Sequence, residues 1–241
     1  MAQYKRAPIT EAVIEIRTRT LLQGSELERL VARFAKKYPA EAQKLFDISM
    51  QVGEAASASK VNQTLNGYRL SSLDGTRLLN LGLQAISTAR LAPYEGWERF
   101  VEEARANWDI WLKVVDWQPL SRIGVRYINR IDIPTMAKIA LDDYFTFLPQ
   151  MPKTLDNGIE HFAMNVLVPL GKDDLKVVLN AGSTQSPLIG HQSLILDLDV
   201  ALNSNLPKEE AGLWAFIDRM RDRKNEVFET CITDKTRALL I

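Results

Sequence analysis

Cysteine and histidine are scarce in this sequence, which has one cysteine and two histidines among 241 residues. Cys231 cannot form an intrachain disulfide, and a lone cysteine is typical of proteins from reducing compartments. Because Cys231 lies on the apolar stripe of the last expected helix, we expect a buried, unreactive thiol. His161 and His191 have no other histidine or cysteine at metal-ligand spacing, which argues against a zinc site and a Ser-His-Asp arrangement.

A net charge of either sign is also lacking, because 30 basic side chains balance 30 acidic ones. The field of the whole molecule therefore does not favour nucleic acid or an anionic membrane. No segment supplies the roughly 20 apolar residues that span a bilayer, and no apolar run follows the basic residues near the N-terminus. We expect a cytoplasmic protein without a membrane partner.

A recognisable phosphate-binding loop is absent as well. The segment Gly182-Ser183-Thr184, with Gly190 farther along, lacks the lysine and the strand-to-helix setting of such loops. Asp197 and Asp199 lie on one face of an expected strand, where they could share a magnesium ion. We favour a solvated or arginine-paired face for these two carboxylates, and we predict neither a metal nor another cofactor.

The sequence does contain an internal repeat, since residues 78–112 align with residues 195–229 without a gap. Each segment has alternating aliphatic residues followed by large apolar residues at helical spacing. The aligned pairs are Leu79 and Leu196, Leu81 and Leu198, Leu83 and Val200, Trp97 and Trp214, Phe100 and Ile217, and Trp111 and Phe228. Such weak symmetry is typical of two fused units. We expect a single domain, residues 1–241, made of two pseudo-repeats at about 1–117 and 118–241.

Hydrophobic periodicity predicts the elements of the first pseudo-repeat. The expected strands are residues 10–20, 46–53, 66–73, 76–84 and 86–91. Ser25 is a suitable cap for the helix after the first strand, and Asp74-Gly75 is typical of a hairpin turn. A long helix follows Pro93 and ends at about Val115, whereas residues 54–59 indicate a flexible loop.

The second pseudo-repeat has a similar order of elements. The expected strands are residues 122–133, 161–170, 175–181 and 193–202. A short helix is expected near residues 141–148, and Asn205-Leu206-Pro207 begins the final long helix. Lys224 interrupts the apolar stripe of that helix and is expected to extend outward. The helical tryptophans at 97, 108, 111 and 214 are expected in the core rather than as stacking platforms for bases.

These elements predict an α+β fold in which duplicated β-α-β(3-4)-α units form one curved antiparallel sheet with two long helices on one face. The element order resembles the duplicated saddle of the TATA-binding protein fold and, more loosely, the helix-grip folds. Order of elements alone implies no activity.

The first strands of the two pseudo-repeats differ in charge. Aligning them matches Glu11 with Arg122 and Glu15 with Arg126 on the outward face. If these strands are neighbours in the sheet, the carboxylates of one can pair with the guanidiniums of the other. The alternative is a polar, arginine-bearing floor that binds a ligand. The candidate ligand-binding residues are Glu11, Glu15, Arg17, Arg122, Arg126 and Arg130.

Two segments carry a family resemblance. The N-terminal residues 4–17, YKRAPITEAVIEIR, and the central residues 122–131, RIGVRYINRI, resemble the motifs of a sporadically distributed bacterial family of uncharacterised proteins of similar length. The C-terminal residues 228–234 resemble the family's ending. The resemblance implies a bacterial, full-length, single-domain protein, and it implies no catalytic residues or substrate.

Three functions follow from the sequence. We favour a non-catalytic binding module for a protein, a peptide or a small anionic ligand, because no compact set of nucleophile, base and oxyanion donors is evident; a homodimer is possible. The second function is nucleic-acid binding through Arg17, Arg19, Arg126 and Arg130. The third is an enzyme with a helix-grip cavity. This requires Glu15, Arg126 and Asn129 to converge, although strand alternation places Arg126 and Asn129 on opposite faces.

Overall fold

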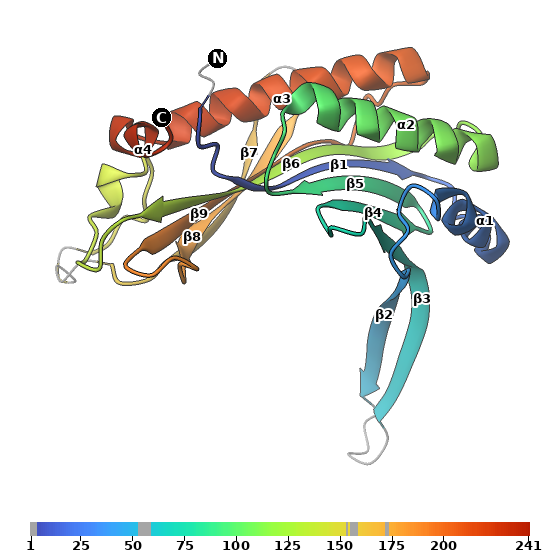
Figure 1. Ribbon diagram of the computed structural model, residues 1–241, viewed down its shortest axis with the longest axis horizontal. Coiled ribbons are helices and arrows are strands. Elements are labelled where there is room, and N and C mark those ends of the chain that lie inside the picture. The colour runs from blue at the N-terminus through green and yellow to red at the C-terminus, as the bar shows by residue number, and fades with distance from the viewer. Residues whose placement is uncertain (1–3, 53–58, 153, 155–158, 172–173) are drawn as a thin grey trace. The chain divides into compact units, whose positions relative to one another are not determined.

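The computed structural model describes residues 4–52, 59–152, 154, 159–171 and 174–241. Within these ranges the chain is α+β, with nine strands in one antiparallel sheet and four α-helices. The strand order is β2-β3-β4-β5-β1-β6-β9-β8-β7 (Figure 1). The predicted fold class is therefore confirmed at this level. No described helix is long and apolar enough to cross a membrane.

The chain forms two compact units. Unit 1 comprises residues 1–14, 91–94 and 121–241, and unit 2 comprises residues 15–90 and 95–120. Strand β1 (Ile9–Thr18) contributes its first part to unit 1 and its second part to unit 2. Neither unit is a continuous half of the chain.

Unit 2 is built from successive antiparallel hairpins and two helices. Its elements after β1 are α1 (Gly24–Phe34), β2 (Gln43–Val52), β3 (Ser59–Ser71), β4 (Arg77–Gly82), β5 (Ala85–Leu91) and α2 (Trp97–Val115). Leu79 and Leu81 of β4 are fully buried, as is Trp111 of α2. Trp108 stacks on Trp111 with ring centroids 6.3 Å apart. The prediction that these tryptophans are buried in the core is confirmed.

Two boundaries in unit 2 differ from the predicted ones. Helix α1 begins at Gly24, so Ser25 is inside the first turn and is not the cap. The backbone N–H of Gln23 instead donates to the Glu26 carboxylate at 2.8 Å. Strand β3 begins at Ser59, well before the predicted strand, and most of the predicted loop at residues 54–59 lies outside the described residues.

Unit 1 packs a long helix on one face of a four-stranded antiparallel ladder (Figure 1). Its elements after β1 are β6 (Leu120–Ile133), β7 (Ala163–Pro169), β8 (Lys176–Thr184), β9 (Gln192–Leu202), α3 (Glu210–Cys231) and α4 (Asp234–Leu239). Val125, Leu198 and Ile217 are fully buried in its core. Cys231 is buried too, as predicted.

The connections in unit 1 are less helical than predicted. Only Leu141–Asp143 form a 3-10 turn, because the following backbone pairs with the end of α3 through a bridge between Phe145 and Ile232. Helix α3 begins at Glu210 rather than near Asn205. Asn205 has a positive φ of 50°, and its side-chain amide donates to Asp174.

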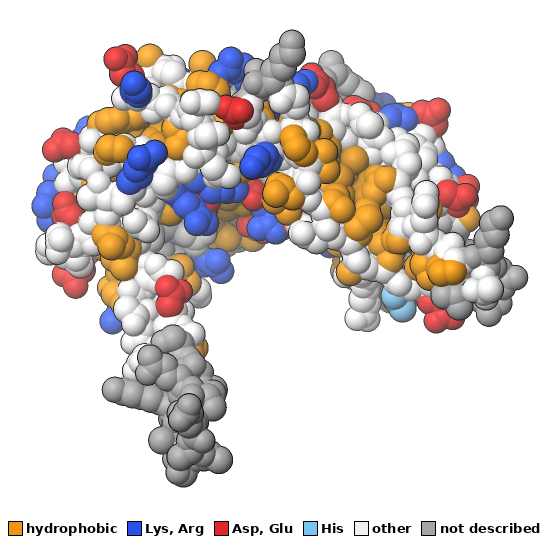
Figure 2. All heavy atoms as spheres, turned by 180° about the vertical axis from the view of Figure 1, so that it is seen from behind, with side chains coloured by type: hydrophobic (Ala, Val, Ile, Leu, Met, Phe, Trp, Pro, Cys, Tyr) orange, Lys and Arg blue, Asp and Glu red, His pale blue; other side chains and the backbone are white. Residues whose placement is uncertain are grey.

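Lys224 and strand β7 depart from ordinary patterns of burial. Lys224 does not extend outward as predicted, since only 5% of its surface is exposed. Strand β7 is the reverse case, because its apolar residues Val166, Leu167 and Val168 are all exposed. Hydrophobic side chains form a continuous patch on this side of unit 1 in the view from behind (Figure 2).

Candidate functional site

The outer face of unit 1, defined as the sheet face opposite α3, carries the arginines of β6. Arg122, Arg126 and Arg130 alternate on this face, whereas Tyr127 and Asn129 between them are buried on the helix side. The Asn129 side-chain amide donates to the backbone oxygen of Leu196 at 2.9 Å. Strand alternation thus places Arg126 and Asn129 on opposite faces, and the convergence required by the helix-grip enzyme does not occur.

Arg126 forms a bidentate ion pair on this face. Its Nε and Nη2 donate to the two carboxylate oxygens of Asp197 at 2.8 and 2.7 Å. Asp197 is 5% exposed and also accepts a hydrogen bond from Asn180 at 2.9 Å. The bond to Asp197 raises the pKa of Arg126, and the charge of Glu11 adds to this effect. The carboxylate bound to Arg126 therefore comes from β9 and not from the N-terminal strand.

Arg122, four residues before Arg126 on the same face of β6, is held in a similar way. Its Nη2 donates to both oxygens of Asp199, at 2.8 and 2.6 Å. The guanidinium lies across Gly124, where a Cβ atom would come within 2.2 Å of Nη1. Glycine at this position lets the arginine lie flat on the strand. The preference for arginine-paired carboxylates at Asp197 and Asp199 is confirmed.

The predicted residues of β1 are divided between the units. Glu11 belongs to unit 1 and makes no side-chain hydrogen bond or ion pair with another described residue. Glu15 and Arg17 belong to unit 2, where the Arg17 Nε donates to the Glu15 carboxylate at 2.8 Å. The six candidate residues are thus divided between the two units, and each of the three β6 arginines has a carboxylate partner in unit 1.

Arg130 is the β6 arginine that also lines a cavity. Its Nε donates to the Asp132 carboxylate at 3.0 and 3.2 Å, and its Nη2 donates to the same group at 3.2 Å. The Ser193 hydroxyl also donates to Asp132. Nη1 of Arg130 is left without a hydrogen-bond partner among the described residues, and 31% of the side chain is exposed.

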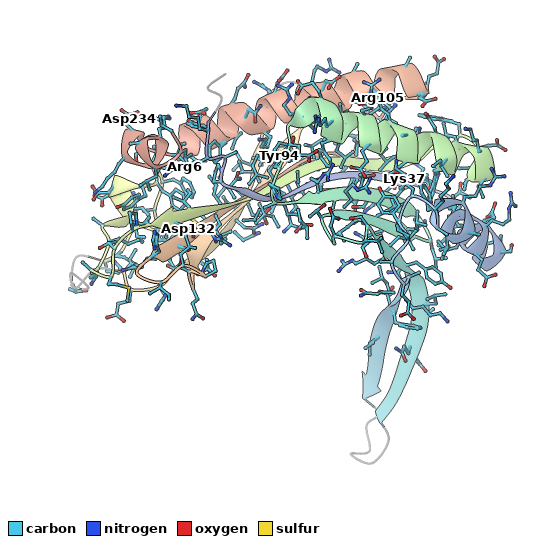
Figure 3. The ribbon with its side chains drawn as sticks, in the orientation of Figure 1. Arg6, Lys37, Tyr94, Arg105, Asp132 and Asp234 are labelled. Carbon is cyan, nitrogen blue, oxygen red and sulfur yellow. The ribbon has the colours of Figure 1, made fainter. Side chains whose placement is uncertain are left out.

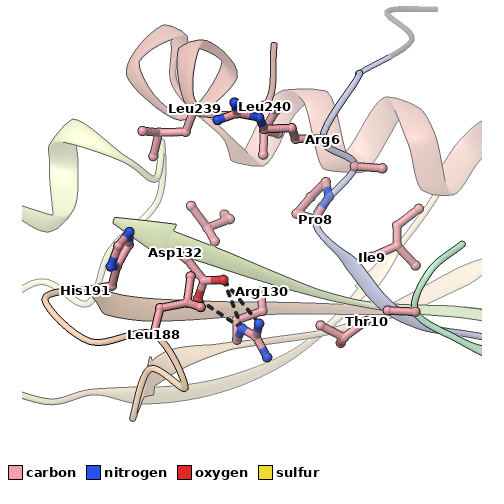
Figure 4. Close-up of a pocket in the computed structure, with 13 residues that line it drawn as sticks. Arg6, Pro8, Ile9, Thr10, Arg130, Asp132, Leu188, His191, Leu239 and Leu240 are labelled. Atoms are coloured by element: carbon pink, nitrogen blue, oxygen red, sulfur yellow. Dashed lines mark hydrogen bonds and ion pairs between the residues drawn. The ribbon is translucent and has the colours of Figure 1, made fainter. Parts of the chain in front are cut away.

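The cavity has a volume of about 360 Å³ and lies entirely within unit 1. Four segments that are distant in the sequence surround it (Figure 4). They are residues 6–10, residues 130–132 of β6, the loop with Leu188 and His191, and Leu239 with Leu240 near the C-terminus; Ala92 completes the lining. Most of these side chains are apolar, and the polar exceptions include Arg6, Arg130, Asp132 and His191.

Backbone hydrogen bonds fix the wall that contains Arg6. The N–H of Arg6 donates to the oxygen of Leu240 at 3.0 Å, and the N–H of Arg130 donates to the oxygen of Pro8 at 2.8 Å. The Arg130 N–H therefore points away from β9. Because alternate residues of an antiparallel strand face the same side, the N–H of Asp132 points toward this wall too.

Arg6 is the cavity arginine that has no ion-pair partner among the described residues. Its exposed guanidinium makes no hydrogen bond or ion pair with any described residue. Asp132, the carboxylate of the lining (Figure 3), is already bonded to Arg130 (Figure 4). It also accepts a hydrogen bond from the Ser193 hydroxyl. His191 is oriented by a hydrogen bond between Nδ1 and the oxygen of Ile189 at 3.0 Å. The cavity therefore carries an excess of positive charge beside an apolar lining.

Sequence reasoning found Arg130 but missed Arg6, Asp132 and His191 as neighbours. Arg6 precedes the first strand and His191 lies in a loop, so neither has a periodicity that indicates its direction. Among the described residues, no three His, Cys, Asp or Glu side chains cluster closely enough to hold a metal ion. The sequence matches no family model and no curated protein.

Proposed function

We propose that this protein is a non-catalytic binding module whose cavity in unit 1 holds a small carboxylate ligand with an apolar tail. The observation that supports this most directly is the Arg6 guanidinium, which lines the cavity without an acidic partner in the described chain. Arginine binds carboxylates through two parallel N–H donors. Nη1 of Arg130 offers further N–H donors from another part of the lining.

The shape and lining of the cavity support the second half of the proposal. A volume of about 360 Å³ lies within the range of roughly 300–1,000 Å³ that is typical of small-molecule sites. Pro8, Leu188, Leu239 and Leu240 provide apolar contacts for a short alkyl or aryl tail. The ion pairs of Arg122 and Arg126 serve mainly to fix β6 against β9 in this proposal.

The proposal predicts that Arg6→Gln weakens binding of octanoate, which we choose as a probe with one carboxylate and an apolar tail. Loss of a charge-assisted hydrogen bond of about 1.5–3 kcal/mol corresponds to a Kd increase of roughly 10-fold or more. Isothermal titration calorimetry measures this change. Arg29→Gln, at an exposed arginine of α1 in unit 2, is the matched control and should leave Kd unchanged.

Octylammonium, which has the same tail and the opposite charge, tests the role of the arginines. It should bind more weakly than octanoate to the wild-type protein. Equal binding of both probes, or an Arg6→Gln variant with wild-type affinity for octanoate, would contradict the carboxylate site.

We also propose that the fold arose by duplication, as the internal repeat suggests, and that it has the saddle-like architecture of the TATA-binding protein type. Support comes from the aligned pair Leu79 and Leu196, both fully buried on strands, and from Trp97 and Trp214, both buried on long helices. The motif resemblance makes membership of the sporadic bacterial family part of this proposal. A cytoplasmic location is consistent with the lone cysteine.

A further inference from the structure

Strand β7 forms one edge of the sheet and has the composition of a buried strand. Residues 162–170 read FAMNVLVPL and contain no charged side chain. Exposure is nevertheless high, at 37% for Val166, 61% for Leu167 and 41% for Val168. Apart from Asn165, both faces of β7 are apolar, and a strand of this kind is normally covered on both faces.

The ladder with β8 determines which backbone groups of β7 are available. The N–H of Leu170 donates to Leu175 at 2.8 Å, and the N–H of Ser183 donates to Phe162 at 3.0 Å. The register between these pairs is continuous, so the even-numbered residues of β7 direct their N–H and C=O groups toward β8. Ala163, Asn165 and Leu167 consequently direct theirs away from the sheet.

Among the described residues, β7 has few of the features that protect edge strands. Natural edges are usually blocked by lysine, by a bulge, by a proline or by a covering segment. Strand β7 has no charge, and its register with β8 has no bulge. Pro169 is at the end of the strand and leaves the outward N–H groups of three residues in place.

We propose that β7 is the dimerisation strand of this protein and pairs antiparallel with β7 of a second copy. In such a two-fold interface the same strand lies on both sides. Because β7 is uncharged, the two copies bring no like charges together. The N–H and C=O groups that point away from the sheet alternate in the same way on both strands, so they can pair. A charged peptide would find no complementary charge on residues 162–170. The second copy therefore fits this edge better than a charged partner does.

Substitutions at Leu167 test this interface without changing the ladder to β8. Leu167→Pro removes an outward N–H, and Leu167→Lys introduces the charge that commonly blocks edges. Sedimentation equilibrium should show a wild-type dimer, with the dimer Kd raised by at least about 10-fold in either variant. Leu73→Lys, at a turn residue that is 82% exposed, is the control and should stay dimeric.

Hydrogen exchange of the wild-type protein provides a measurement that needs no variant. Amides of Ala163, Asn165 and Leu167 should exchange more slowly at high protein concentration than at low concentration, whereas those of Met164 and Val166 should not change. A wild-type monomer across this concentration range, or dimers unaffected by both Leu167 substitutions in folded protein, would overturn the proposal.

Discussion

Lys224 carries its amine into the interior of unit 1, where Nζ lies 3.8 Å from the centre of the Tyr127 ring. Burial, together with a smaller effect from the charge of Arg221, lowers the pKa of Lys224 to about 7, whereas the charge of Glu229 acts in the opposite direction. The unfolded chain has the ordinary value of 10.5. Between these two values the folded protein binds fewer protons than the unfolded chain, so its stability should rise with pH by at most ~1.4 kcal/mol per pH unit.

Lys224→Met should remove the cost of burying this amine, which is fully present below pH 7. We expect the free energy of unfolding at pH 7 to increase by roughly 1–4 kcal/mol. We also expect a smaller rise in stability between pH 7 and 10. Urea denaturation at several pH values measures both effects, with Lys36→Met, at an exposed turn residue just after α1, as the control. An unchanged pH dependence in Lys224→Met would show that the amine is not the cause.

Predictions of burial for single residues were correct where the hydrophobic effect alone decides the position of the side chain. Burial of Trp108, Trp111 and Cys231 follows from their place on apolar stripes. Lys224 lies on such a stripe as well, and the cost of burying a charge favoured the outward orientation. Contact with the Tyr127 ring, which no sequence pattern reports, accompanies the inward orientation instead.

Gly67 in β3 shows how an element depends on a close backbone approach. A Cβ atom at this position would lie 2.2 Å from the backbone oxygen of Leu81 and 2.9 Å from the Cα of Gly82 on the neighbouring strand β4. Because both neighbours are backbone atoms, a shift of the strand is required to make room. Gly67→Ala should therefore lower the free energy of unfolding by roughly 1–3 kcal/mol.

Gly24→Ala is the matched control for this prediction. Gly24 begins α1, and a Cβ atom there would have no neighbour within 4 Å. Alanine also has the higher helix propensity, so the change in stability should be neutral or slightly favourable. Thermal and urea denaturation compare the two variants. Equal stability of Gly67→Ala and Gly24→Ala would contradict the close approach of β3 and β4.

At the level of elements, strong periodicity gave reliable predictions and irregular backbone did not. The strands observed as β6 and β9 and the end of α2 at Val115 were predicted within one or two residues. The helix predicted near residues 141–148 is not formed, because the backbone groups of Tyr144 and Thr146 bond to the last residue of α3 and to the segment that follows it. Such long-range hydrogen bonds leave no local pattern.

At the level of the whole molecule, composition and element order were sufficient for the α+β class but not for the cavity. The row of arginines on β6 could be predicted because alternation fixes the face of each side chain. The carboxylate partners Asp197 and Asp199 depend on strand β9 lying beside β6, which the sequence does not specify. The cavity requires segments near residues 6, 131, 190 and 240 to meet, and no periodicity connects them.

The balance of charge over the whole chain bears on nucleic-acid binding. Thirty basic and thirty acidic side chains give no net attraction for phosphate, and three of the four arginines considered for this role already bind carboxylates. The fourth, Arg19, donates to the backbone oxygen of Leu120 at 3.2 Å. Phosphate contacts would have to compete with these bonds, so we expect affinity for duplex DNA weaker than the roughly 1–100 µM of non-specific binders. Fluorescence anisotropy with labelled DNA and RNA over a salt titration measures this. Micromolar binding that weakens steeply with salt would instead support a nucleic-acid-binding face.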